Sequence, residues 1–297
     1  MTGLVDTTRT TGEPVRVQAV REVELGMTHD IRGMRVVWRR EMIRFTRDPI
    51  RMVTQITQPV LYLFILGTGL SALTAHHGFG NLNFRTFMYP GIIAMTVLFT
   101  SMFSAMSIVW DREFGFLREM LVSPVRRWAI LLGKCLGGTT VATLQGVLIL
   151  ALAGAVGVPY SPKMLGTLIG EMVLAAFALN AFGILMAARI KQMQAFQWVM
   201  NFLAMPMFFL SGAIYPLSSL PVWLTVLTRI DPLAYAVDPL RRAIFGSIAV
   251  SPQALRMLNP GVSWNGWRVP TLVELALVAC FAVVLLGIAI HQFSRTD

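Results

Sequence analysis

Six apolar stretches dominate this sequence, and each is long enough to cross a lipid bilayer. A hydrocarbon core about 30 Å thick requires about 20 helical residues. Within lipid every backbone N–H and C=O must be satisfied inside the segment, so such stretches have to be α-helices. The predicted spans are 52–73, 88–110, 130–156, 164–187, 195–214 and 271–292. The sequence therefore predicts an all-α polytopic membrane protein with six transmembrane helices.

The composition leaves no room for a large soluble domain. Hydrophobic residues make up 55% of the chain and charged residues only 13%, about half the charged share of an ordinary soluble protein. The net charge of +10 would suggest a nucleic-acid partner in a soluble protein. Here most arginines lie beside the spans, so membrane orientation explains them and we expect no nucleic acid. The two cysteines are far apart and do not support a disulfide framework or a metal site.

Basic residues predict the orientation, because Lys and Arg concentrate in cytoplasmic loops. They are dense before the first span (32–51), between the second and third (112–134), and between the fourth and fifth (189–191). This distribution predicts a multi-pass protein of the plasma (inner) membrane with both termini cytoplasmic. The outer segment 215–270 also carries arginines, but long loops obey the rule weakly.

The chain before the first span divides into two parts. Residues 1–27 are polar and lack an apolar core, which predicts a disordered cytoplasmic leader before a membrane domain over 28–297. Residues 28–48 alternate apolar side chains and arginines at helical spacing, which favours an amphipathic interfacial helix with Thr28 as N-cap. An ordinary solvated helix beside the membrane is the alternative.

The cytoplasmic loop 111–124 combines dense charge with apolar side chains. Phe114, Phe116 and Leu117 lie among Glu113, Arg118 and Glu119, and Ser123-Pro124 ends the segment. Apolar side chains in a charged loop favour a partner surface. Packing against the chain's own bundle or on the membrane would account for the same pattern.

A second irregular segment covers 211–247. Its apolar runs are too short to span a membrane, and Pro and Gly interrupt them. Such a pattern favours a re-entrant or outer-leaflet helical element packed on the bundle.

At these two segments the chain resembles the permease subunits of type-2 ABC (ABC-2) exporters, and it looks most similar to the daunorubicin-resistance type. The matching features are the Glu113–Pro124 loop with Gly133-Lys134 after it, the stretch from Ser211-Gly212 to Pro221, and Asp231-Pro232 through Arg241. With the six spans, the resemblance covers about 28–292.

The resemblance implies a division of labour between subunits. It makes 28–48 the connecting helix, 111–123 the coupling helix that docks on a separate ATPase, and 215–247 an extracellular helical hairpin. It also implies two copies of the ATPase and a second permease half, identical or homologous. The implied hairpin residues are Tyr215, Pro216, Pro221, Asp231, Pro232 and Arg241.

No ATP-binding signature occurs in the sequence, because Gly133-Lys134 is followed by Cys135 and the upstream glycine of the motif is missing. We therefore expect a non-enzymatic chain with no cofactor of its own, and ATP and Mg²⁺ on the partner subunit. The residues expected to transmit the motion are Glu113, Phe114, Phe116, Leu117, Arg118 and Glu119.

The expected cargo is a lipophilic drug or lipid. Intramembrane carboxylates are costly and usually face protein or a cavity, and Phe and Met form adaptable walls. The candidate pathway residues are Glu171, Glu274, Phe99, Phe103, Met205 and Phe208. Core packing or lipid contact explains the same Phe and Met residues and is the favoured interpretation of them.

Three rival functions stay open at this point. A polysaccharide or glycolipid exporter would share the same fold. A membrane-embedded enzyme would need a nucleophile–base pair or metal cluster within the spans, and a secondary transporter would usually show inverted repeats. Neither feature is evident in the sequence.

Overall fold

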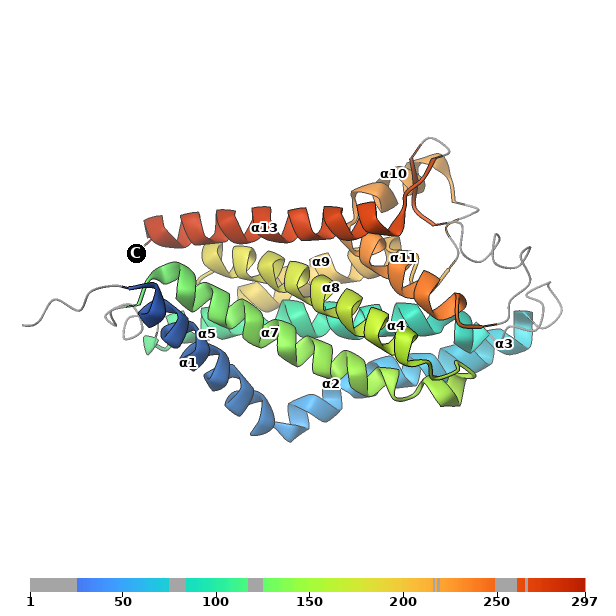
Figure 1. The fold of residues 1–297 in the computed structure, drawn as a ribbon, viewed down its shortest axis with the longest axis horizontal. Helices are drawn as coiled ribbons and strands as arrows, with labels where there is room; N and C mark the ends of the chain where they lie inside the picture. Colours follow the sequence, from blue (N-terminus) through green and yellow to red (C-terminus); the bar gives the residue numbers. More distant parts are fainter. Residues whose placement is uncertain are drawn as a thin grey trace, which may run out of the picture.

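The computed structural model describes residues 26–74, 84–116, 125–215, 217, 220–248, 261–264 and 267–296. These residues form a bundle of helices that run roughly along one direction (Figure 1). Helix α1 begins and helix α13 ends at the same end of the bundle, which we call the terminal end. Helices α10 and α11 lie at the opposite end, which we call the hairpin end.

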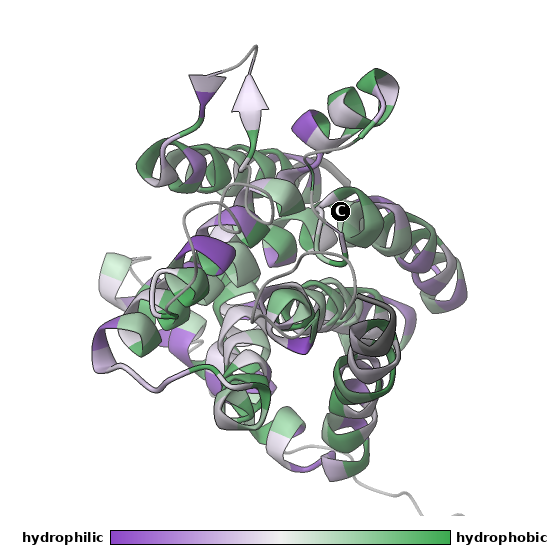
Figure 2. Ribbon diagram, turned by 90° about the vertical axis from the view of Figure 1, so that its right-hand side faces the viewer, coloured by the Kyte–Doolittle hydropathy of each residue, from purple (hydrophilic) through white to green (hydrophobic). Residues whose placement is uncertain are grey.

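The described elements are α1 (Met27–Thr46), α2 (Pro49–Leu61), η1 (Tyr62–Leu66), α3 (Gly67–Thr74), α4 (Phe84–Ser104), α5 (Met106–Glu113), α7 (Arg127–Leu150), η2 (Ala153–Val156), α8 (Pro162–Arg189), α9 (Met193–Leu210), α10 (Val222–Ile230), α11 (Pro232–Phe245), β1 (Ser263–Trp264), β2 (Trp267–Arg268) and α13 (Thr271–Thr296). The two short strands pair antiparallel. Hydrophobic colouring predominates on the bundle helices in the end-on view, where the strands and α10 project from the bundle (Figure 2).

Four of the described helical stretches are long and apolar enough to cross a membrane. They are Pro49–Ser71, Phe84–Glu113, Pro162–Arg189 and Thr271–Phe293, which correspond to the first, second, fourth and sixth predicted spans. Helices α7 and α9 occupy the third and fifth positions and contain the polar residues Lys134 and Gln197. The mostly helical membrane architecture is confirmed, and the count of six spans stays a prediction.

Helix α4 forms the centre of the bundle. In the most apolar part of its span, 72% of the residues are buried. The corresponding share is 17% for the span that begins at Pro49. The Tyr89 hydroxyl donates to the carbonyls of Ile149 at 3.0 Å and Leu150 at 2.9 Å, which ties α4 to the end of α7. The buried Gln145 of α7 donates to Gln55 of α2 at 2.8 Å, the kind of interhelical hydrogen bond that membrane bundles use.

Helix α1 packs closely on α7 because two glycines of α7 face it. A Cβ at Gly133 would lie 2.8 Å from the Met34 carbonyl oxygen, and one at Gly137 would lie 2.8 Å from Glu41 Cβ. Small residues four apart allow helix backbones to approach each other in this way. The helix predicted over 28–48 therefore forms, with one face against protein. The predicted N-cap was wrong, since Gly26 occupies that position and Thr28 lies within the first turn.

The first span is not a regular α-helix throughout. Residues Tyr62–Leu66 form a π-helical turn between α2 and α3. A π-turn holds one residue more than an α-turn. The span therefore carries a local widening after Pro59, which lies inside α2.

Candidate functional site

A buried cluster of charged side chains joins three helices toward the terminal end. Lys134 of α7 places its Nζ 2.6 Å from Asp111 Oδ2 of α5 and 3.3 Å from Glu41 Oε1 of α1. The same ammonium donates to the Ser107 hydroxyl at 3.1 Å, and Arg40 contacts Asp111 Oδ2 at 2.5 Å. We call Glu41, Asp111 and Lys134 with Arg40 the charge cluster.

The charge cluster is electrically balanced and largely removed from solvent. Glu41, Asp111 and Lys134 expose only 7%, 4% and 4% of their surface. Buried charges are tolerated when they are paired and hydrogen-bonded, and here Lys134 and Arg40 oppose Asp111 and Glu41. Because the members come from α1, α5 and α7, a shift of α5 must displace α1 and α7 or break an ion pair.

Side chains of the last turn of α5 also contact the ends of three other helices, α8, α13 and α9. Arg112 Nη1 donates to the Ala187 carbonyl at 3.0 Å, near the C-terminus of α8, and its guanidinium lies 5.8 Å from the ring of Phe293 in α13. Glu113 Oε2 accepts from the Met193 N–H at 3.0 Å, at the N-terminus of α9. A cation at a helix C-terminus and an anion at an N-terminus are both favourable with respect to the helix dipole.

The residues that follow α5 turn outward. Gly115 adopts a φ of +82°, a left-handed conformation that favours glycine, and this turn ends α5. Phe114 and Phe116 are 56% and 51% exposed, although Phe114 also stacks against Trp110 with centroids 4.9 Å apart. The other predicted transmission residues, Leu117, Arg118 and Glu119, lie outside the described residues.

A second ionic cluster lies at the hairpin end. Arg242 Nη2 of α11 contacts Asp238 Oδ2 at 2.5 Å and Glu274 Oε1 of α13 at 3.2 Å. Arg242 also donates to the Val269 carbonyl at 2.9 Å. Glu171 of α8 is buried close enough for electrostatic interaction with Arg242 and Asp238. The structure thus brings the two candidate carboxylates, Glu171 and Glu274, to one end of the bundle, around an arginine.

The four apolar pathway candidates do not join those carboxylates. Phe99 and Phe103 stack on each other along α4 with centroids 6.4 Å apart. On α9, Phe208 is buried and Met205 is 40% exposed. Their role in a substrate pathway stays a prediction.

The predicted hairpin residues cap and anchor α11. Asp231 accepts from the Leu233 N–H at 3.0 Å as N-cap, and Pro232 follows as the first helical residue. Burial raises the pKa of Asp231 to about 7, and the hydrogen bond from Leu233 opposes that shift. Arg241 donates to the Gly212 carbonyl and lies 4.9 Å from the ring of Phe87. Burial lowers the pKa of Arg241 to about 10, against the opposing effect of Asp238.

The remaining hairpin predictions are less informative. Pro221 is the N-cap of α10, and Tyr215 is half-buried, with burial raising the pKa of its hydroxyl. Pro216 lies outside the described residues.

Sequence reasoning missed the charge cluster. In the sequence Lys134 ends the basic segment 112–134, and Glu41 lies within the amphipathic segment 28–48. Two signals were available: Glu41 falls one turn after the buried Val37 on an otherwise arginine-rich helix, and Lys134 interrupts an apolar run. A charge at an apolar position indicates a buried partner.

Comparisons with known proteins identify relatives of the chain. The family model described as ABC-2 type transporter matches residues 32–245. A transport permease designated ycf38 from Cyanophora paradoxa is 30% identical over 215 residues, 71% of this chain and 73% of that protein. The multidrug ABC transporter permease YbhR from Escherichia coli K12 is 35% identical over 161 residues, 53% of this chain and 43% of its own length. Nodulation protein J from Rhizobium leguminosarum bv. viciae is 26% identical over 245 residues, 82% of this chain and 92% of that protein.

Proposed function

Since the chain belongs to the ABC-2 type transporter family, we propose that it is the permease subunit of an ATP-driven exporter in the plasma membrane. Membership of this family implies association with an ABC ATPase. In this proposal two ATPase copies hydrolyse ATP with Mg²⁺, and the terminal end of the bundle faces the cytoplasm, where the ATPase docks. A second permease half completes the assembly.

The observation that carries the proposal is the position of the last turn of α5. Its side chains contact α1 and α7 through Asp111, α8 and α13 through Arg112, and α9 through Glu113. Exposed aromatic residues follow directly. A partner that binds Phe114 and Phe116 and moves α5 would therefore move the five contacted helices with it. Alternating access between two helix packings requires such a concerted movement.

The proposed cargo is a lipophilic drug or lipid. The designation of the Escherichia coli relative as a multidrug permease supports a lipophilic small molecule. A polysaccharide or glycolipid is the alternative cargo. The two are separated by which compounds stimulate ATP hydrolysis by the reconstituted complex.

The decisive experiment replaces the exposed aromatics. We expect the double variant Phe114→Ala, Phe116→Ala to lose at least about tenfold in affinity for the ATPase subunit, because truncating buried aromatic anchors typically costs more than 1 kcal/mol each. The measurement is co-purification and equilibrium binding of an ABC ATPase subunit that binds the unmodified chain. In vesicles the variant complex should lose export.

The matched control is Trp223→Ala, which removes an aromatic that is 66% exposed at the hairpin end. It should bind the ATPase like the unmodified chain. Equal binding by the unmodified chain and the double variant would contradict docking at this loop. Nucleotide hydrolysis by the permease alone would contradict the division of labour.

A further inference from the structure

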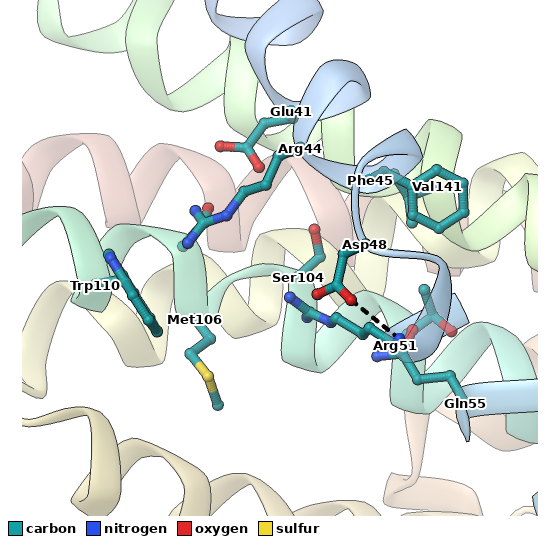
Figure 3. A pocket seen from close by; sticks show the side chains of 12 residues that line it. Glu41, Arg44, Phe45, Asp48, Arg51, Gln55, Ser104, Met106, Trp110 and Val141 are labelled. Atoms are coloured by element: carbon teal, nitrogen blue, oxygen red, sulfur yellow. Dashed lines mark hydrogen bonds between the residues drawn. The ribbon is translucent and has the colours of Figure 1, made fainter. Parts of the chain in front are cut away.

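A cavity of about 190 Å³ lies beside the charge cluster, at the junction between α1 and α2. Side chains from α1, α2, α4, α5 and α7 line it (Figure 3). One water molecule needs about 10–15 Å³ of such space, so the cavity has room for a group much larger than a water. The lining residues used below are Glu41, Arg44, Asp48, Arg51, Gln55, Thr100, Ser104, Ser107 and Trp110.

Two arginines supply the positive charge of this cavity. Figure 3 shows the guanidinium groups of Arg44 and Arg51 pointing into the space between α1–α2 and α5. Arg44 lies over the ring of Trp110, 5.3 Å from its centroid. Arg51 Nη2 reaches a backbone carbonyl, that of Phe103, at 3.4 Å. Among the described residues, no carboxylate forms an ion pair with either guanidinium.

Two carboxylates, Glu41 and Asp48, also line the cavity and interact electrostatically with Arg51, and each has a further hydrogen-bond partner. Glu41 accepts from Lys134 at 3.3 Å in the charge cluster. Asp48 accepts from the backbone N–H of Arg51 at 3.1 Å as the N-cap of α2. Besides these two carboxylates, the cavity presents two guanidinium groups and the polar side chains of Ser104 and Gln55. The two guanidinium groups match the donors that bind phosphate, since arginine forms charge-assisted bonds to phosphate oxygens.

The depth of the cavity points to a membrane ligand. Arg51 and Gln55 belong to the first turns of the span that begins at Pro49, so the cavity lies at the level where lipid headgroups meet the hydrocarbon. The lining also includes apolar side chains, Phe45, Met106 and Val141. On the same helix as Arg51 and Gln55, Ile50 and Val53 are 77% and 64% exposed, and offer a surface for an acyl chain.

We propose that this cavity binds the phosphate-bearing headgroup of an anionic amphiphile from the adjacent leaflet, with Arg44 and Arg51 as its ligands. The proposal goes beyond the exporter function, because it holds whether the amphiphile is cargo or a resident lipid. The ligand would contact α1, α2 and α5 at once, next to the charge cluster.

The test measures binding of a fluorescent short-chain phosphatidic acid to the purified full chain in a neutral detergent. Unlabelled dioctanoyl phosphatidic acid should displace the probe, and dioctanoyl phosphatidylcholine should do so at least about tenfold less well, because its headgroup carries no net charge. The double variant Arg44→Gln, Arg51→Gln should lose at least about tenfold in affinity. The variant Arg44→Lys, Arg51→Lys should retain part of the binding, since it keeps both charges.

Two further variants separate this site from a general charge effect. Arg35→Gln with Arg39→Gln removes the same charge from the exposed face of α1 and should bind the probe like the unmodified chain. Met106→Trp fills the cavity without a change in charge and should weaken binding, which keeps the test decisive if the arginine variant fails to fold.

Each outcome bears on the proposal. Undiminished binding by Arg44→Gln, Arg51→Gln, or equal loss in Arg35→Gln, Arg39→Gln, would overturn it. Displacement by inorganic phosphate at the same concentration as phosphatidic acid would assign the site to free phosphate instead. Failure of ATPase docking at Phe114 and Phe116 would leave this assay unaffected, so the two proposals fail separately.

Discussion

At the scale of single residues, the charge cluster is the most exacting feature of the molecule. Lys134 is surrounded by partners from α1 and α5, and its Nζ makes three hydrogen bonds within 3.3 Å, to Glu41, Ser107 and Asp111. The benefit of such a cluster is geometric, because ion pairs in an apolar setting hold only when every partner is in place. The same side chains therefore fix the positions of α1, α5 and α7 relative to one another.

We expect Lys134→Met to lower the free energy of unfolding by about 3 kcal/mol, because it leaves Asp111 and Glu41 buried with only Arg40 to compensate them. Unfolding in mixed detergent micelles, followed by circular dichroism, measures the change.

Lys163→Met serves as the control, since Lys163 is exposed at the start of α8 and its loss should change stability by less than about 0.5 kcal/mol. Equal effects of the two substitutions would mean that the cluster contributes nothing specific.

At the scale of elements, helix packing depends on where glycine permits a close approach. Gly133 and Gly137 allow α1 to pack closely on α7, because a Cβ at either position would clash with α1. At Gly166 in α8, by contrast, a Cβ would lie in open space. The helices themselves follow from apolar runs and local caps such as Asp48-Pro49 and Asp231-Pro232, and these were predictable. Which helices meet was not, because Glu41 and Lys134 are 93 positions apart and no local pattern links them.

The two glycine sites predict opposite responses to the same change. Gly133→Ala should destabilise the protein by about 1–3 kcal/mol, because its Cβ would lie 2.8 Å from the Met34 carbonyl oxygen and 2.9 Å from Val37 Cβ. Gly166→Ala should stabilise it by up to about 1 kcal/mol through helix propensity alone.

Thermal unfolding of both variants in one detergent provides the comparison. A stabilising effect of Gly133→Ala would show that α1 does not pack on α7 in the way described.

At the scale of the whole molecule, burial is unevenly shared among the spans. In the spans formed by α4–α5 and by α8, 72% and 67% of the residues in the most apolar part are buried. In the spans that begin at Pro49 and Thr271 the shares are 17% and 28%. Helix α9 also presents large apolar side chains outward, with Trp198 and Phe202 exposed at 71% and 76%. These surfaces suit lipid or a second permease half, and the sequence alone could not tell which helices would be peripheral.

A crosslinking experiment tests whether α9 faces a second copy. In a Cys280→Ser background, which removes the exposed free thiol while Cys135 stays buried, Phe202→Cys should give a covalent dimer with a short bismaleimide. Val283→Cys, at a site 67% exposed on α13, should not.

Dimer formation at Val283→Cys alone would place the interface on α13 instead. Co-purification of a different permease with uncrosslinked chain would indicate a heterodimer.

The π-turn at Tyr62–Leu66 has a mechanical consequence. One α-helical residue corresponds to about 100° of rotation. If the π-turn changed to α-helical hydrogen bonding, α3 would rotate by about that angle relative to α2. Such a rotation needs only a change of hydrogen-bond register, with no melting of the helix. Helix α3 would then rotate about its axis while Arg51 and Gln55 in α2 stay in place. The side chains that α3 presents to its surroundings would change without a change in helix tilt.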